Sequence, residues 1–172
     1  MLWPRLARGV VSGGRSARAA PDEAVAEALA ERLRAAGRLR RGRSLAIRVV
    51  DAGSCNGCEL EIRMLAGVVY DLERYGLTFV ASPRHADVLL VTGPVTRNLA
   101  EALAATHAAT PQPAWVVAIG DCAADGGVFK GSGAVLGGVA EALPVDLLIP
   151  GCPPPPERIL AGLLALLEAE AG

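Results

Sequence analysis

Aromatic side chains are almost missing from this chain of 172 residues, which has two Trp, two Tyr and two Phe. Long hydrophobic runs are missing too: no stretch approaches the roughly 20 consecutive apolar residues that a helix needs to cross a bilayer. Met1–Val11 has a few basic and apolar residues but no long apolar core and no convincing cleavage site. We therefore expect no secretory signal and a chain that stays in the cytoplasm.

Cysteine is also scarce, with four residues in the whole chain. Thiols stay reduced in the cytoplasm, so four cysteines there indicate metal binding or catalysis before they indicate disulfides. A chain of this length can bury a hydrophobic core without such crosslinks. Hydrophobic residues make up 52% of it and are mainly Ala, Val and Leu. This composition favours helices packed closely on a sheet and argues against disorder.

The two parts of the chain carry opposite charge, although the net charge is only −1. Residues 1–50 hold 11 Arg and 4 acidic residues, which gives +7, and residues 51–172 hold 6 basic and 14 acidic residues, which gives −8. The basic arm can meet anionic lipid headgroups or an acidic partner subunit, or it is simply solvated. It lacks interleaved aromatic residues, so we do not expect it to bind nucleic acid.

Sequence patterns divide the chain into a basic N-terminal arm, residues 1–44, and an α/β domain, residues 45–172. In the arm, the helical spacing of Val25, Leu29 and Leu33 predicts one helix. In the domain, short apolar runs alternate with helical patterns. The predicted strands are Leu45–Val50, Leu77–Ala81, Asp87–Thr92, Ala114–Ile119 and Val145–Ile149, and the predicted helices are Glu59–Tyr75, Arg97–His107, a short one near Val135–Ala142, and Glu157–Glu170.

Most of these strands are apolar throughout, which is typical of a parallel sheet covered by helices on both faces. The predicted fold is a small flavodoxin-like, doubly wound α/β domain with a mostly parallel sheet, in which ligands bind at the carboxyl ends of the strands. Cys55, Cys122 and Cys152 each come just after a predicted strand, and Cys58 follows Cys55 in a C-x2-C pair. All four thiols should therefore meet at one edge of the domain.

Glycines crowd the same loops, and Pro153 follows the last cysteine directly. Glycine lets the backbone approach a bulky inorganic group, and proline after a cysteine is frequent in ferredoxin-type cluster motifs. Four cysteines can ligate a [4Fe–4S] cluster or a structural zinc ion, although zinc sites usually have two close C-x2-C pairs. A thioredoxin-like redox pair would leave Cys122 and Cys152 unexplained, and buried inert cysteines are the remaining interpretation.

Four segments of the domain stand in a specific order. They are Ala52–Ile62 (AGSCNGCELEI), Ala86–Thr96 (ADVLLVTGPVT), Gly120–Phe129 (GDCAADGGVF) and Pro150–Pro154 (PGCPP). Together they resemble the small subunit of energy-converting, membrane-bound [NiFe] hydrogenases, including formate hydrogenlyase. The same superfamily includes the cluster-bearing subunit of respiratory complex I, which typically has two adjacent cysteines in the first motif. Here Asn56 and Gly57 separate Cys55 from Cys58, which favours the hydrogenase side.

The resemblance implies that Cys55, Cys58, Cys122 and Cys152 ligate one [4Fe–4S] cluster in an oxidoreductase subunit without catalytic residues of its own. It implies electron transfer between ferredoxin-type clusters and the [NiFe] site of a separate large subunit. The implied partners are this hydrogenase-type large subunit, a ferredoxin-like iron–sulfur subunit and integral membrane subunits, on the cytoplasmic face of the inner membrane. One alternative is the equivalent subunit of a complex-I-like NADH–quinone oxidoreductase or of a nickel-free relative. Another is a zinc-stabilised assembly module.

Acidic residues accompany the cysteines. Glu59 follows Cys58 directly. We expect it either on a proton path between subunits, close to the cluster, or simply at the start of a helix, where the helix dipole favours a negative charge. Asp121 and Asp125 flank Cys122, and we expect both to form turns.

Overall fold

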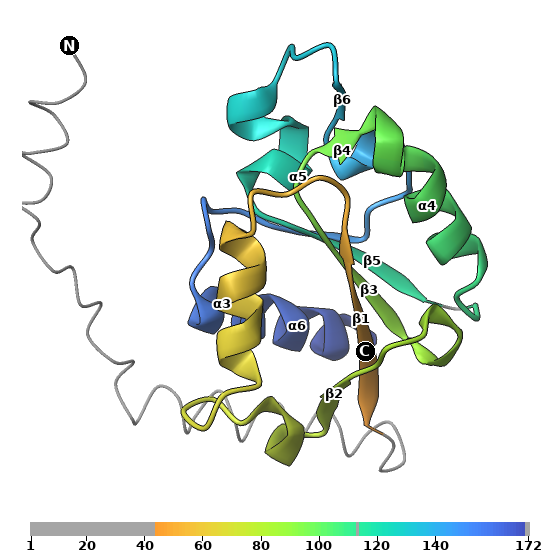
Figure 1. Ribbon diagram of the computed structural model, residues 1–172. Helices are drawn as coiled ribbons and strands as arrows, with labels where there is room; N and C mark the ends of the chain where they lie inside the picture. Colours follow the sequence, from red (N-terminus) through yellow and green to blue (C-terminus); the bar gives the residue numbers. More distant parts are fainter. Residues whose placement is uncertain (1–43, 113, 171–172) are drawn as a thin grey trace, which may run out of the picture.

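The central sheet has five parallel strands in the order β2-β1-β3-β5-β7. The computed structural model describes residues 44–112 and 114–170, so the predicted helix of the basic arm lies outside the described residues. The order is that of flavodoxin-like sheets, which confirms the predicted fold class (Figure 1). The strands are β1 (Leu45–Asp51), β2 (Leu77–Phe79), β3 (Val88–Thr92), β5 (Trp115–Ile119) and β7 (Leu147–Ile149).

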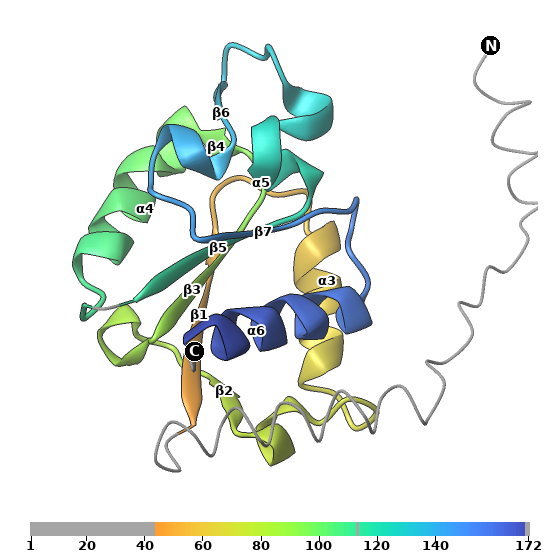
Figure 2. The ribbon, with the colours of Figure 1, turned by 180° about the vertical axis from the view of Figure 1, so that it is seen from behind.

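Helices cover both faces of this sheet (Figures 1 and 2). The central strand β3 shows why its sequence is apolar throughout: all five of its residues are buried. Leu90 belongs to one hydrophobic core, and Leu89 and Val91 belong to another on the opposite face. The first core includes side chains of α3 (Gly57–Leu65) and α6 (Pro156–Glu170), and the second includes side chains of α4 (Arg97–Ala108) and the short α5 (Asp121–Asp125).

The predicted helix Glu59–Tyr75 is wrong in its second half, because α3 ends at Leu65. The N–H of Gly67 donates to the carbonyl of Met64 at 3.0 Å, a bond that tightens the end of the helix. Glycine is also a poor helix former, so the helix does not continue through it. The helical spacing farther on corresponds to a separate 3₁₀ turn, Leu72–Tyr75.

The predicted short helix near Val135–Ala142 is wrong in its first half, and in its second half only the 3₁₀ turn Val139–Glu141 is helical. Val135–Gly137 forms strand β6, which pairs antiparallel with β4 (Val95–Thr96) in a second, two-stranded sheet. Gly138 explains the difference. A Cβ on this residue would lie 2.2 Å from the carbonyl oxygen of Ala124 in α5, so the chain runs too close to α5 at this point for a side chain to fit.

The strands end together at one edge of the main sheet. The strand register pairs Asp51 with Thr92, Thr92 with Ile119, and Ile119 with Ile149. Each of these four residues is the last of its strand. The loops that follow β1, β5 and β7 therefore leave the sheet side by side, although they are far apart in the sequence.

The helices of the domain are short. The longest in the described part of the chain, α6, has 15 residues, fewer than the roughly 20 that a membrane span requires. Within residues 44–112 and 114–170, no helix is long and apolar enough to cross a membrane.

Candidate functional site

The four cysteines meet at the carboxyl edge of the sheet. Cys55 lies in the loop after β1, Cys58 in the first turn of α3, Cys122 in α5, and Cys152 in the loop after β7. All four are free thiols. They line one small pocket together with Ser54, Gly57, Gly93, Asp121, Gly151 and Pro153. The structure thus brings together the whole predicted set, and its role as a ligand set stays a prediction.

The thiols surround a space, which we call the cysteine pocket. In the part of the chain that the structure describes, no three His, Cys, Asp or Glu side chains lie close enough to hold a single metal ion. The four cysteines nevertheless line the same pocket.

Glycine is required where the loops touch two of the sulfur atoms. A Cβ on Gly120 would lie 2.7 Å from Sγ of Cys58, and a Cβ on Gly127 would lie 2.8 Å from Sγ of Cys122. Both glycines also have positive φ, +92° and +51°, which side chains disfavour. The backbone consequently lies directly against these sulfur atoms, closer than any residue with a side chain would allow.

The surroundings of Cys58 and Cys122 oppose the ionisation of their thiols. Burial raises the pKa of the Cys58 thiol to about 12, and the negative charge of Glu59 is the next largest cause. Burial also raises the pKa of Cys122, although a hydrogen bond from the backbone N–H of Val128 acts in the opposite direction. Thiolates gathered here need a compensating positive charge, and bound metal ions supply one while displacing the protons.

Two carboxylates hold the loop after β1, which carries Cys55. Asp51 Oδ1 accepts hydrogen bonds from the N–H groups of Gly53 and Ser54, each at 2.7 Å. The Ser54 hydroxyl donates to one oxygen of Glu59 at 2.5 Å, and the hydroxyl of the buried Thr92 donates to the other. Glu59 therefore ties the loop after β1 to the end of β3, and its predicted place on a proton path stays a prediction.

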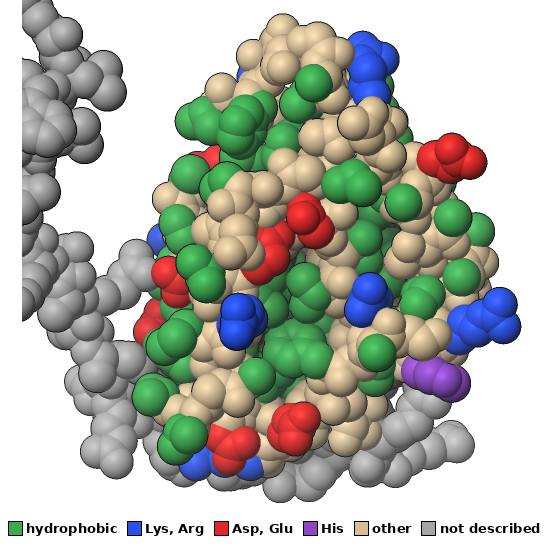
Figure 3. All heavy atoms as spheres, in the orientation of Figure 1, with side chains coloured by type: hydrophobic (Ala, Val, Ile, Leu, Met, Phe, Trp, Pro, Cys, Tyr) green, Lys and Arg blue, Asp and Glu red, His purple; other side chains and the backbone are tan. Residues whose placement is uncertain are grey.

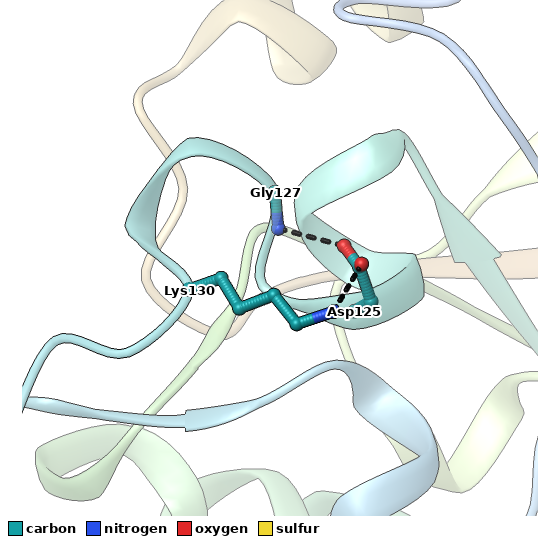
Figure 4. A network of polar contacts seen from close by, with 3 residues as sticks. All are labelled: Asp125, Gly127 and Lys130. Atoms are coloured by element: carbon teal, nitrogen blue, oxygen red, sulfur yellow. Dashed lines mark hydrogen bonds and ion pairs between the residues drawn. The ribbon is translucent and has the colours of Figure 1, made fainter.

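Asp121 joins the segment that carries Cys122 to the loop that carries Cys152. Its N–H donates to the carbonyl of Gly151 at 2.9 Å, and its carboxylate accepts from the N–H of Gly151 at 2.8 Å. Asp125 forms the predicted turn, because it accepts from the N–H of Gly127 at 3.0 Å and pairs with Lys130 at 2.8 Å (Figure 4). Asp121, in contrast, bonds to a loop 30 residues away and not to a turn of its own.

A second, larger cavity of about 540 Å³ was missed by the sequence reasoning. It lies between α3 and the strands β1 and β2, and hydrophobic side chains line the hollow on this face (Figure 3). Val49, Ile62 and Phe79 form much of its wall, and Glu59 and Arg63 supply the charged part. No local pattern could have revealed it, because its wall combines three segments that only the fold brings together.

Known proteins resemble this chain along most of the domain. The family described as "NADH ubiquinone oxidoreductase, 20 Kd subunit" matches residues 55–166. A probable membrane-bound hydrogenase subunit, mbhJ, from Pyrococcus furiosus is 47% identical over 127 residues, which are 74% of this chain and 76% of that protein. Formate hydrogenlyase subunit 7 from Escherichia coli is 43% identical over 129 residues, which are 73% of this chain and 51% of that protein.

Solved structures extend the comparison to three dimensions. One is a chain in the structure of the membrane-bound sulfane sulfur reductase, described as an archaeal respiratory membrane complex. It is 35% identical in sequence, with a TM-score of 0.66, and the match covers 75% of this chain and 71% of that one.

Proposed function

The chain belongs to the NADH ubiquinone oxidoreductase 20 Kd subunit family, and from this membership we propose that it carries one [4Fe–4S] cluster in an oxidoreductase complex. The resemblance predicted from the four motifs is confirmed by the family match and by the hydrogenase relatives. The observation that carries the proposal is the cysteine pocket itself. Three loops bring four thiols to it, and all four cysteines lie within the matched span.

The residues of the pocket fit such a cluster. Each of the four cysteines would bind a different iron, which suits four cysteines that line the same pocket. A bound cluster supplies a centre that gains and loses one electron. Gly120 and Gly127 bring the backbone against two of the sulfur atoms, and Val128 directs an N–H to Cys122. Hydrogen bonds to sulfur and exclusion of water are the means by which a protein sets the potential of a cluster.

The proposed role is electron transfer, with the catalytic centre on another subunit. The cysteine pocket would receive electrons from a ferredoxin-like iron–sulfur subunit and pass them to the [NiFe] site of a hydrogenase-type large subunit. The names of two relatives, a membrane-bound hydrogenase subunit and a formate hydrogenlyase subunit, support this assignment. The chain would then be a peripheral subunit on the cytoplasmic face of the membrane, attached through integral membrane subunits.

A second candidate is the same electron carrier in a complex without nickel. The relative in the membrane-bound sulfane sulfur reductase favours it, because that name describes a different reaction on a chain 35% identical to this one. The large subunit decides between the two candidates. Paired C-x2-C motifs in that partner would support hydrogen chemistry, and their absence would support the nickel-free complex.

The first test is a count of metal and sulfide in the anaerobically purified chain, with low-temperature EPR after reduction by dithionite. We expect about four irons and four sulfides per chain and the signal of one reduced cluster. Alanine in place of any one of the four cysteines should abolish or convert that signal. Zinc without iron or sulfide, or an unchanged four-iron signal in all four variants, would overturn the proposal.

A further inference from the structure

Asp121 is the only charged side chain among the described residues that line the cysteine pocket. It directly precedes Cys122 and is the first residue of α5. Its carboxylate does not point along its own loop. It reaches instead to Gly151, the residue that directly precedes Cys152.

Two hydrogen bonds join these neighbours of the two cysteines. Gly151 accepts from the N–H of Asp121 at 2.9 Å and donates its own N–H to the Asp121 carboxylate at 2.8 Å. Gly151 has no room for a side chain, because its φ is +144° and a Cβ on it would lie 2.7 Å from Cα of Pro154. Two cysteines that are 30 residues apart in the chain are thus connected through hydrogen bonds between their immediate neighbours.

The carboxylate also affects the charge balance of the pocket in two ways. A negative charge beside a group that accepts an electron makes the reduced state less favourable. In addition, Asp121 occupies the N–H of Gly151, which can then no longer donate to sulfur. Such N–H donors favour the reduced, more negative state of a cluster, and Val128 provides one at Cys122.

We propose that Asp121 is a positioning residue that fixes the separation of Cys122 and Cys152 and lowers the reduction potential of the group they bind. The inference rests on the proposed function, since it requires a cluster in the cysteine pocket. The Asp121 carboxylate would then act together with the four sulfur ligands in setting the reduction potential of the cluster, without being a ligand itself.

Three variants separate the two effects. Asp121→Asn keeps an oxygen that can accept from Gly151 and removes the charge, whereas Asp121→Ala removes both. Asp125→Asn is the matched control, because Asp125 lies on the same short helix and already pairs with Lys130. Each full-length protein is reconstituted anaerobically with iron and sulfide. The potential is measured by EPR-monitored redox titration, and the release of iron to a chelator is followed over time.

Asp121→Asn should have a more positive potential, with about three- to tenfold more reduced cluster at a fixed potential. It should release iron at the wild-type rate, because its oxygen still accepts from Gly151. Asp121→Ala should release iron several times faster, and Asp125→Asn should match the wild type in both measurements. If Asp121→Asn does not fold, Asp121→Ser gives the same comparison, since its hydroxyl is an uncharged acceptor.

A wild-type potential in Asp121→Asn, or a wild-type rate of iron release in Asp121→Ala, would overturn the inference while leaving the proposed function intact. A wild-type protein that takes up no iron and sulfide is a different result. It would overturn the proposed function, and the role of Asp121 with it.

Discussion

At the scale of single residues, Gly120 is the position where an added methyl group should harm the site most. Its φ of +92° and the 2.7 Å between an added Cβ and Sγ of Cys58 both oppose a side chain. We expect Gly120→Ala to retain little iron after reconstitution and to lower the free energy of unfolding by about 1–3 kcal/mol. Gly133→Ala is the control, because nothing lies within 4 Å of its added Cβ. Equal iron content in the two variants would contradict this expectation.

Glu59 gives a second prediction at this scale. Glu59→Ala would remove the carboxylate acceptor from the hydroxyls of Ser54 and the buried Thr92, and the Thr92 hydroxyl would keep only its bond of 3.3 Å to the carbonyl of Val50. We expect a loss of about 1–3 kcal/mol in the free energy of unfolding, measured by chemical denaturation, because the buried hydroxyl of Thr92 loses the shorter of its two hydrogen bonds. Glu59→Gln should lower the free energy of unfolding by less, since its amide keeps an acceptor oxygen.

The control for this pair is Glu61→Ala in the same helix, which should change stability by no more than about 0.5 kcal/mol. Similar losses at both glutamates would show that the contacts to Ser54 and Thr92 do not matter for folding.

The cysteines could be predicted from the sequence, whereas the carboxylate contacts could not. Cys55, Cys122 and Cys152 each follow an apolar run, and parallel strands bring such positions to one edge. The bond from Asp121 to Gly151 depends on two loops that are 30 residues apart, and the bond from Thr92 to Glu59 depends on which residue ends β3. Local pattern carries no information on either pairing.

At the scale of secondary structure, strands were easier to predict than helix ends. A central strand such as Val88–Thr92 is buried on both faces, and a short, uninterrupted apolar run is typical of such a strand. Helical spacing was less reliable: Glu59–Tyr75 continued the spacing through Gly67, and Val135–Ala142 matched a helix although Gly138 must pass against Ala124. Close approaches of this kind belong to the packing of distant segments and leave no periodic signal.

The packing of α6 on β7 provides a prediction about whole elements. Gly162 lies in the middle of α6, and a Cβ on it would meet Cδ1 of the buried Ile149 at 2.5 Å. Alanine is the better helix former by about 1 kcal/mol, so propensity alone predicts that Gly162→Ala stabilises. We expect the opposite, a loss of about 1–3 kcal/mol, because the helix or the strand must shift.

The double variant with Ile149→Ala tests the cause, since alanine has neither the Cδ1 at 2.5 Å nor the Cγ1 at 2.8 Å that an added Cβ would meet. In that background Gly162→Ala should lower the free energy of unfolding by clearly less. Chemical denaturation of the wild type, the two single variants and the double variant would measure the difference. If the Gly162→Ala protein were more stable than the wild type, α6 would be free to move away from β7.

At the scale of the whole molecule, apolar side chains remain exposed both beside the cysteine pocket and beyond the C-terminal end of α3. Val128, which directs its N–H to Cys122, is 81% exposed, and Val68, just beyond the C-terminal end of α3, is 99% exposed. Exposed apolar side chains that cluster on a subunit often mark contacts with partners. Cys58 lies in the first turn of α3, so the helix, about 13 Å long at 1.5 Å per residue, separates Val68 from the cysteine pocket.

This separation makes the proposed partner testable. In the proposed role an electron would pass from the cysteine pocket into the large subunit over a short distance, and we therefore expect that subunit to cover the loop of Val128. We expect Val128→Asp to reduce copurification of the large subunit with the tagged chain by about tenfold or more, because a charge would be buried at the contact. Val68→Asp introduces the same charge at another exposed valine and should leave this partner bound. If Val68→Asp releases the large subunit and Val128→Asp does not, the partner lies on the far end of α3, and electrons must leave the pocket by another route.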